Sequence, residues 1–232
     1  MARTIRKLLA CAALVAVAFA AGAALADVTI TMESETKSLT GNKTQTVTQY
    51  YTPTKMRHEL GETSMMIMDL DEQRVITIMP ASRKYFVQTF EQLKARLARM
   101  KLPETKVEIE ETDEEAEIAG YTCHKVIVRT TTGTSKSVTE AWVAKDVKGI
   151  ADVHAFHKAM VEAYKNVPQH WANMVAPKQF AEKGLFPLKT VAKQAGMTVT
   201  MTVTKIEEGD VDEALFEIPE GYEEMRLDGD SR

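Results

Sequence analysis

The sequence predicts an α+β fold in which a strongly curved, mostly antiparallel sheet forms an incomplete β-barrel, with helices plugging or covering its concave face. Two observations predict this class. Most of the chain after residue 26 consists of short runs in which apolar and polar residues alternate, with Gly, Asn or Pro between the runs. Few stretches have helical apolar spacing, too few to cover a flat sheet. A curled sheet with helices on its concave side fits both observations.

The expected strands follow from this alternation. In the first run, Val28, Ile30 and Met32 occupy one side and polar residues the other, as in a half-buried strand. Two β-branched runs flank a turn near Gly133, and we expect this hairpin in the middle of the sheet. An acidic run at 106–117 reads as an edge strand, where charge discourages unwanted pairing. Strands are expected at 28–35, 44–51, 55–60, 64–70, 74–79, 84–87, 106–117, 121–130, 137–144, 184–195 and 197–207.

Two regions have helical character. Thr89 is a suitable N-cap for a helix over 90–101, because Phe90, Leu93 and Leu97 recur at helical spacing after it. The second region, 146–184, has an apolar stripe followed by Pro168, a residue that ends one helix or begins the next. We expect both regions to contribute helices to the concave side.

The first 26 residues predict a signal peptide. A basic start precedes an apolar run over 8–24, and Ala24-Leu25-Ala26 is a small-residue cleavage site. Cys11 comes too early in the apolar run to be a lipid-attachment site. We therefore expect cleavage after Ala26, a mature single domain over 27–232, and a periplasmic location.

Composition narrows the classes of function. The formal net charge is −4, which argues against nucleic acid as a partner. Loss of Cys11 leaves Cys123 alone, so a disulfide framework is impossible and stability must come from the core. The sequence contains no nucleophile elbow, phosphate-binding glycine loop or redox cysteine pair. We therefore expect neither enzyme activity nor a cofactor.

Two patterns raise metal binding as an alternative. His154 and His157 are spaced i, i+3 on an expected helix, which can place two imidazoles on one metal ion. The thioethers of Met65, Met66 and Met68 suit a soft metal. Methionine is frequent throughout the chain, however, and this distribution favours a pliable apolar interior over a metal site. We expect no metal site.

Several stretches resemble the lipoprotein-localisation carriers of the LolA/LolB-like fold and related exported proteins of unknown function. They are a Pro-x-x-apolar-Arg strand at 53–57, a strand ending in Asp69, the turn at 80–85, and the closing stretch 215–222. The resemblance implies an incomplete barrel plugged by helices, with an apolar interior that receives acyl chains. It also implies that Arg57 helps to hold the helical lid to the barrel. His58 stands where the carriers commonly have an aromatic residue.

The combined expectation is a soluble periplasmic carrier or sensor that holds a lipid, an acyl chain or another apolar ligand between the sheet and a helical lid, with Arg57 as the latch of that lid. One alternative is a non-enzymatic envelope protein that docks another protein and has no ligand cavity. A metal-binding envelope protein is the weaker alternative. The side chains expected to line the ligand site are those of Met66, Met68, Trp142, Phe156, Met160 and Trp171.

Overall fold

The computed structural model describes residues 27–100, 103, 105–163, 180, 182–194 and 196–226. The expected signal peptide and Trp171 lie outside these residues. The elements in chain order are β1 (Val28–Ser38), β2 (Gly41–Tyr51), β3 (Lys55–Leu60), β4 (Ser64–Asp69), β5 (Arg74–Met79), η1 (Pro80–Ser82), β6 (Lys84–Thr89), α1 (Phe90–Arg99), β7 (Thr105–Ile118), β8 (Tyr121–Thr132), β9 (Ser135–Lys145), α2 (Ile150–Ala163), β10 (Leu185–Gln194), β11 (Met197–Glu208), η2 (Glu213–Phe216) and β12 (Glu223–Glu224).

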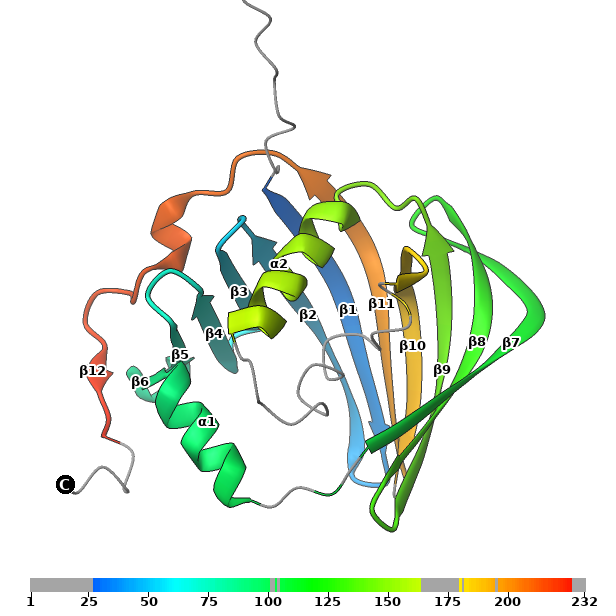
Figure 1. The fold of residues 1–232 in the computed structure, drawn as a ribbon, viewed down its shortest axis with the longest axis horizontal. Helices are drawn as coiled ribbons and strands as arrows, with labels where there is room; N and C mark the ends of the chain where they lie inside the picture. The colour runs from blue at the N-terminus through cyan, green and yellow to red at the C-terminus, as the bar shows by residue number, and fades with distance from the viewer. Residues whose placement is uncertain are drawn as a thin grey trace, which may run out of the picture.

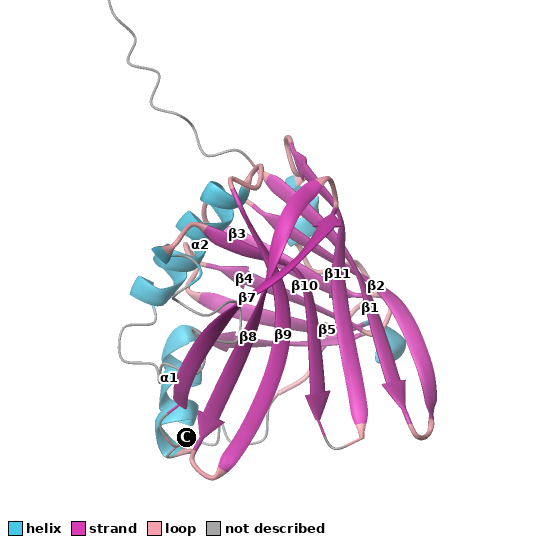
Figure 2. Ribbon diagram, turned by 90° about the vertical axis from the view of Figure 1, so that its right-hand side faces the viewer, coloured by secondary structure: helices cyan, strands magenta, loops and turns pink. Residues whose placement is uncertain are grey.

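All the described strands belong to one 12-stranded sheet, in the order β12-β6-β5-β4-β3-β2-β1-β11-β10-β9-β8-β7. Every neighbouring pair is antiparallel except β12 and β6. The sheet is strongly curved and not closed, with α1 and α2 on its concave side (Figure 1). The side view shows both helices on the same side of the twisted strands (Figure 2). The predicted fold class is confirmed.

The order of the strands corrects one sequence expectation. The hairpin that turns at Gly133 is β8–β9, and it lies next to the β7 edge rather than in the middle of the sheet. The middle is formed instead by β1 and its long-range partner β11, whose register shifts between Thr31 and Met32. A shift of this kind marks a bulge, which sharpens the local twist and so promotes the curvature of the sheet.

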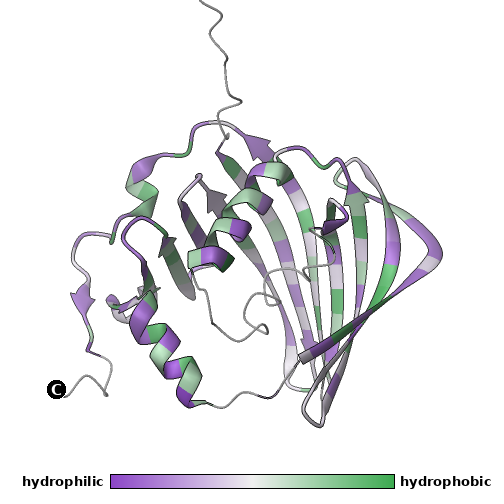
Figure 3. Ribbon diagram, in the orientation of Figure 1, coloured by the Kyte–Doolittle hydropathy of each residue, from purple (hydrophilic) through white to green (hydrophobic). Residues whose placement is uncertain are grey.

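The concave face is apolar because the strands alternate. On β1, Val28, Ile30 and Met32 are buried and point toward the helices. Figure 3 shows the corresponding alternation of hydrophobic and hydrophilic residues along the neighbouring strands. One cluster joins this face to both helices, and a second packs Phe180 against buried residues of β8 and β9. Most of the core therefore lies on the concave side.

The helices are placed by caps and by the core. Thr89 and Gln92 form a capping box at the start of α1, as the N-cap prediction requires. Phe90, Leu93 and Leu97 are buried in the cluster that also contains α2. The Lys94 ammonium donates to the carbonyl of Ala163, 2.9 Å away, and so ties α1 to the end of α2. No described helix is long and apolar enough to cross a membrane.

The convex face of β2–β6 is covered by residues 209–225, which we call the C-terminal strap. Its Phe216 packs against Ile67, Ile76 and Ile78 on the outer side of the sheet. The amide of Val211 donates to an Asp27 carboxylate oxygen at 2.9 Å, near the start of the strap. At the other end, the pairing of β12 with β6 holds the strap to the edge. Half of the sheet is thus packed on both faces.

Gly149 controls how closely α2 approaches the sheet. Its φ is +74°, and a Cβ at this position would lie 3.0 Å from Cγ2 of Val28. Gly120 has a similar φ of +81° but has nothing within 4 Å of the corresponding position. The two glycines therefore form a matched pair that separates backbone strain from steric overlap.

We predict that Gly149→Ala lowers the free energy of unfolding by about 1–3 kcal/mol more than Gly120→Ala. Both variants carry the left-handed penalty of about 1–2 kcal/mol, but only the first displaces α2 from Val28. Urea denaturation followed by circular dichroism measures the difference. Equal destabilisation by the two variants would contradict the close packing of α2 on β1.

Candidate functional site

The candidate site lies where α2 covers β2, β3 and β4. In an antiparallel pair, directly opposite residues point to the same face. His58 lies opposite both Gln49 and Met66, and Met56 lies opposite both Tyr51 and Met68. The buried side chains of Tyr51, Met56 and Met68 belong to the cluster that contains α2, so this whole set faces the concave side.

A short hydrogen-bonded chain runs along this apolar surface. The Tyr51 hydroxyl donates to Oε1 of Gln49 at 3.2 Å, and Nε2 of Gln49 lies 3.2 Å from Nδ1 of His58. An amide nitrogen only donates, so Nδ1 accepts and neutral His58 carries its proton on Nε2. Burial raises the pKa of Tyr51 and lowers the pKa of His58. All three side chains are therefore uncharged at neutral pH.

The second half of the site comes from α2. The rings of Phe156 and His157 each meet the Tyr51 ring edge-on, with centroids 5.6 and 5.7 Å away. Burial, with a smaller contribution from nearby His154, lowers the pKa of His157 to about 4. Burial also lowers the pKa of His154. The Nε2 atoms of both histidines are buried and have no hydrogen-bond partner in the described structure.

Unpaired buried nitrogens are costly. Leaving such a group unsatisfied costs about 1–3 kcal/mol, and native structures contain only a few. We refer to Gln49, Tyr51, His58, His154 and His157 together as the concave polar cluster. In it, an otherwise apolar surface carries polar groups from both the sheet and the helix, and two of these groups remain available to a partner.

The structure brings together most of the residues expected to line a ligand site. Met68, Phe156 and Met160 are buried in the main core cluster, and Met66 and Trp142 pack against it. The registers place the Trp142 side chain on the other face of the sheet, because Trp142 lies opposite Lys189, Lys189 lies opposite Thr202, and Thr202 pairs with exposed Glu33 rather than with buried Met32. On that face its ring meets the ammonium groups of Lys125 at 5.3 Å and Lys189 at 4.9 Å. Trp171 lies outside the described residues. The assignment of these side chains to a ligand remains a prediction.

Arg57 lies on the opposite face from the one expected. It neighbours inward-facing Met56 on β3, and its side chain therefore points to the convex side. Its guanidinium donates to the carbonyl of Leu215 in the strap, to Glu59 at 2.6 Å, and to the Met65 sulfur at 3.1 Å. The expected bonds to the long helices are replaced by a bond to the C-terminal strap. Arg57 thus holds a different segment from the one that the resemblance implies.

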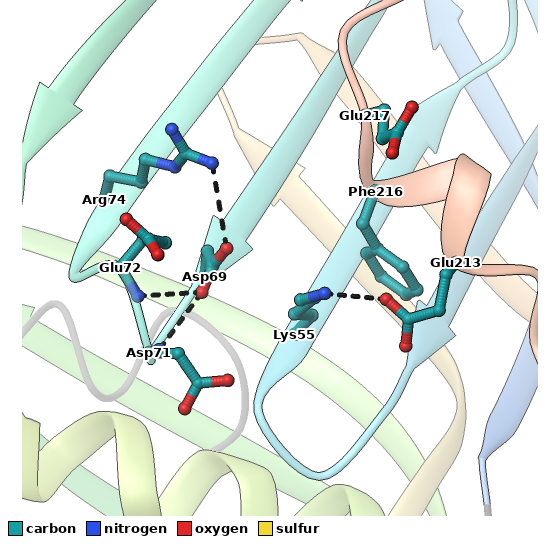
Figure 4. A pocket seen from close by; sticks show the side chains of 8 residues that line it. All are labelled: Lys55, Asp69, Asp71, Glu72, Arg74, Glu213, Phe216 and Glu217. Carbon is teal, nitrogen blue, oxygen red and sulfur yellow. Dashed lines mark hydrogen bonds and ion pairs between the residues drawn. The ribbon is translucent and has the colours of Figure 1, made fainter.

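A polar cleft of about 320 Å³ lies between the strap and the β4–β5 turn (Figure 4). Five of its eight lining residues are carboxylates, and internal contacts already engage several of them. Asp69 accepts from the amides of Asp71 and Glu72 at 3.0 Å, and Lys55 pairs with Glu213 at 2.6 Å. The Glu213 hydrogen bond is the main reason that the pKa of Lys55 is raised. We therefore interpret the cleft as the place where polar side chains join the strap to β3 and the β4–β5 turn.

The described residues place few possible metal ligands close together. Within the described residues, no group of three or more His, Cys, Asp or Glu side chains could hold a metal ion. Cys123 is a buried free thiol on β8, and burial raises its pKa. The pair formed by His154 and His157 supplies two nitrogens on one helix.

The chain belongs to the family described as "Domain of unknown function (DUF4412)", whose model matches residues 27–222. No curated protein matches the chain. Similar solved structures include PNGF-II in space group C2, with a TM-score of 0.41, 14% identity, and coverage of 87% of this chain and 31% of that chain. The present chain thus spans about a third of PNGF-II.

Two further structures come from the class that the sequence resembles. One is a putative outer membrane lipoprotein-sorting protein domain from Vibrio parahaemolyticus, with a TM-score of 0.33, 9% identity, and coverage of 83% of this chain and 89% of that chain. The other is a LolA superfamily protein from Nitrosomonas europaea, with a TM-score of 0.36, 6% identity, and coverage of 83% and 90%. Structures similar to this chain therefore include LolA superfamily members.

Three of the five residues of the concave polar cluster were not predicted from the sequence to lie at a site. Gln49 and Tyr51 read only as members of an alternating strand, and His58 only as a replacement for an aromatic residue. The available signal was the pairing of Gln49 with His58 across a short turn. That pairing places two polar side chains on the face where Met56 is buried, which is unusual for a core surface.

We predict that acid weakens the fold through His157. Its pKa is about 4 in the folded chain and 6.5 in the unfolded chain, so between these values only the unfolded chain binds the proton. The free energy of unfolding should therefore fall as pH decreases from 6.5 to 4, by about 3 kcal/mol from this residue. His157→Phe should remove this part of the pH dependence.

Urea denaturation at several pH values measures the effect. His124→Phe is the matched control, because His124 lies on β8 with 60% of its side chain exposed. Equal pH dependence in the wild type and His157→Phe would show that His157 is not buried in its neutral form.

Proposed function

We propose that the protein binds a lipid, an acyl chain or another apolar ligand between the concave face of the sheet and the helices. The observation that carries this proposal is the apolar concave face of an open sheet, covered by only two described α-helices. Binding to such a face is stabilised by about 25 cal/mol for each Å² of apolar surface that it removes from water. An acyl chain supplies such surface without requiring specific polar partners.

The side chains on this face suit an irregular apolar ligand. Met66 and Met68 lie on β4 and Met160 on α2, all within or against the main core cluster. Unbranched thioether side chains adapt their shape to different partners more readily than branched ones. The aromatic rings of Tyr51 and Phe156 add rigid apolar area beside them. The combination favours a carrier or sensor with loose chain selectivity, and not an enzyme.

The helices are attached in a way that permits opening. One polar bond between α1 and α2 runs from the Lys94 ammonium to the Ala163 carbonyl. Beyond it, α2 rests on the sheet through the buried face formed by Ile150, Val153, Phe156 and Met160. Apolar contacts are non-directional, so a ligand chain can replace them with little loss. The helices are therefore the lid of the proposed site.

We further propose that this binding takes place in the periplasm after removal of residues 1–26. The basic start, apolar run and A-x-A site of that segment support export. A periplasmic carrier would protect acyl chains from water between membranes. A protein that docks another envelope protein instead would co-purify with that partner in a fixed ratio and without lipid.

We predict that delipidated protein binds an environment-sensitive fluorescent fatty acid with saturable enhancement of its emission. Met66→Glu should weaken binding by about tenfold or more, because it places a carboxylate on the apolar concave face. Met197→Glu is the matched control, since Met197 is 40% exposed at the start of β11. Circular dichroism confirms that both variants remain folded. Identical affinities in the wild type and Met66→Glu, or no saturable binding, would contradict the proposal.

A further inference from the structure

Two imidazoles stand out on the apolar concave side. His154 and His157 are three residues apart on α2, so they lie on neighbouring positions of one helix face. They are also close enough for His154 to contribute electrostatically to the lowered pKa of His157. The Nε2 atom of each is buried and lacks a hydrogen-bond partner among the residues that the structure describes.

The other three residues of the concave polar cluster are hydrogen-bonded to one another. Tyr51, Gln49 and His58 are linked to one another by two hydrogen bonds of 3.2 Å. The Nε2 atoms of His154 and His157 differ from these groups because they have no hydrogen-bond partner among the described residues. A pair of unsatisfied nitrogens requires a ligand with at least two hydrogen-bonding atoms close together, and that ligand must also tolerate apolar surroundings.

We propose that His154 and His157 bind the carboxyl group of an amphiphilic carboxylic acid whose hydrocarbon chain occupies the apolar concave face. This inference rests on the proposed function, and it identifies the polar end of the ligand. A carboxylate presents two acceptor oxygens, one for the Nε2–H of each imidazole. A methyl ester has no charge and accepts only neutral hydrogen bonds.

Charge balance favours a complex that has gained one proton. A free carboxylate entering an apolar site would be an unpaired buried charge, which is strongly unfavourable. If one imidazole takes a proton from solvent as the ligand binds, the result is an imidazolium–carboxylate pair with no net charge. Hydrogen bonds within such a pair are roughly twice as strong as neutral ones. Ligand binding is therefore coupled to the uptake of about one proton.

Neighbouring groups do not already provide this partner. The other titratable residues nearby are Tyr51 and His58 on the concave face of β2 and β3, Glu91, Lys94, Arg96 and Arg99 on α1, and Asp152, Lys158 and Glu162 on α2. Burial and His154 are the causes of the lowered pKa of His157, and no carboxylate is among them. Lys94 is engaged by the Ala163 carbonyl. The carboxylate must then come from the ligand.

The test compares dodecanoic acid with its methyl ester, using the full mature protein and the double variant His154→Phe/His157→Phe. Phenylalanine keeps an aromatic ring against Tyr51 while removing both nitrogens. Isothermal titration calorimetry at pH 7.4 in phosphate and in Tris measures affinity and proton uptake together. His124→Phe serves as the control for removal of an exposed histidine.

The wild type and His124→Phe should bind the acid about tenfold or more tightly than the ester, with uptake of about one proton for the acid alone. The double variant should bind both ligands with the affinity of the ester and take up no proton. Equal binding of acid and ester by the wild type, with no effect of the double variant, would overturn this inference and leave the proposed function intact.

Two other results would also decide the matter. Stoichiometric Zn²⁺ or Cu⁺ binding by the wild type that the double variant loses, without an acid preference, would assign the pair to a metal and overturn the proposal. Failure of the wild type to bind either the acid or the ester would overturn both this inference and the proposed function.

Discussion

The structure depends on one constraint: an open, strongly curved sheet must bury an apolar concave face. Inward residues such as Val28, Ile30 and Val47 have no solvent exposure because α2 and neighbouring strands cover them. Two helices give limited cover to a sheet of this width. The core cluster therefore gathers where α2 covers β2 and its neighbours, and Gly149, directly before α2, permits a close approach to Val28 on β1. A ligand that supplies further apolar surface would complete the burial of this face.

The concave face also carries polar groups that a purely structural core would avoid. Tyr51, Gln49 and His58 compensate one another through hydrogen bonds, whereas His154 and His157 leave buried nitrogens unpaired. A site that binds a ligand retains such groups because the ligand satisfies them, even though the unliganded fold is less stable as a result. The convex face shows the opposite design. There Arg57 and the strap form a closed set of contacts, consistent with a structural role.

Local patterns predicted the elements and the fold class, because alternation and caps are properties of neighbouring residues. The strand of Val28, Ile30 and Met32 and the cap at Thr89 follow from sequence alone. The order of the strands does not, since the pairing of β1 with β11 joins residues far apart in the chain. The bulge near Met32 has no local signal either. For this reason the hairpin at Gly133 was expected in the middle of the sheet but lies near an edge.

The candidate site could be predicted only in part, because local patterns identify core residues but not the contacts between distant segments. Apolar residues such as Met68 and Phe156 are recognisable as core residues, and the structure places them together. The face occupied by Arg57 depends on which side of β3 the helices cover, and a strand pattern is symmetric in that respect. Arg57 contacts the strap at Leu215, which lies 158 residues later in the chain. Its contact with β3 is non-local and could not be derived from either segment alone.

Native mass spectrometry of the protein, gently purified from the periplasm, tests ligand binding on the concave face most directly. Ligand binding predicts a mass above that of the mature polypeptide, and release of an acyl-containing molecule when the protein is denatured. A mass equal to that of the polypeptide alone, together with a dry interior filled by side chains in a high-resolution crystal structure, would contradict it.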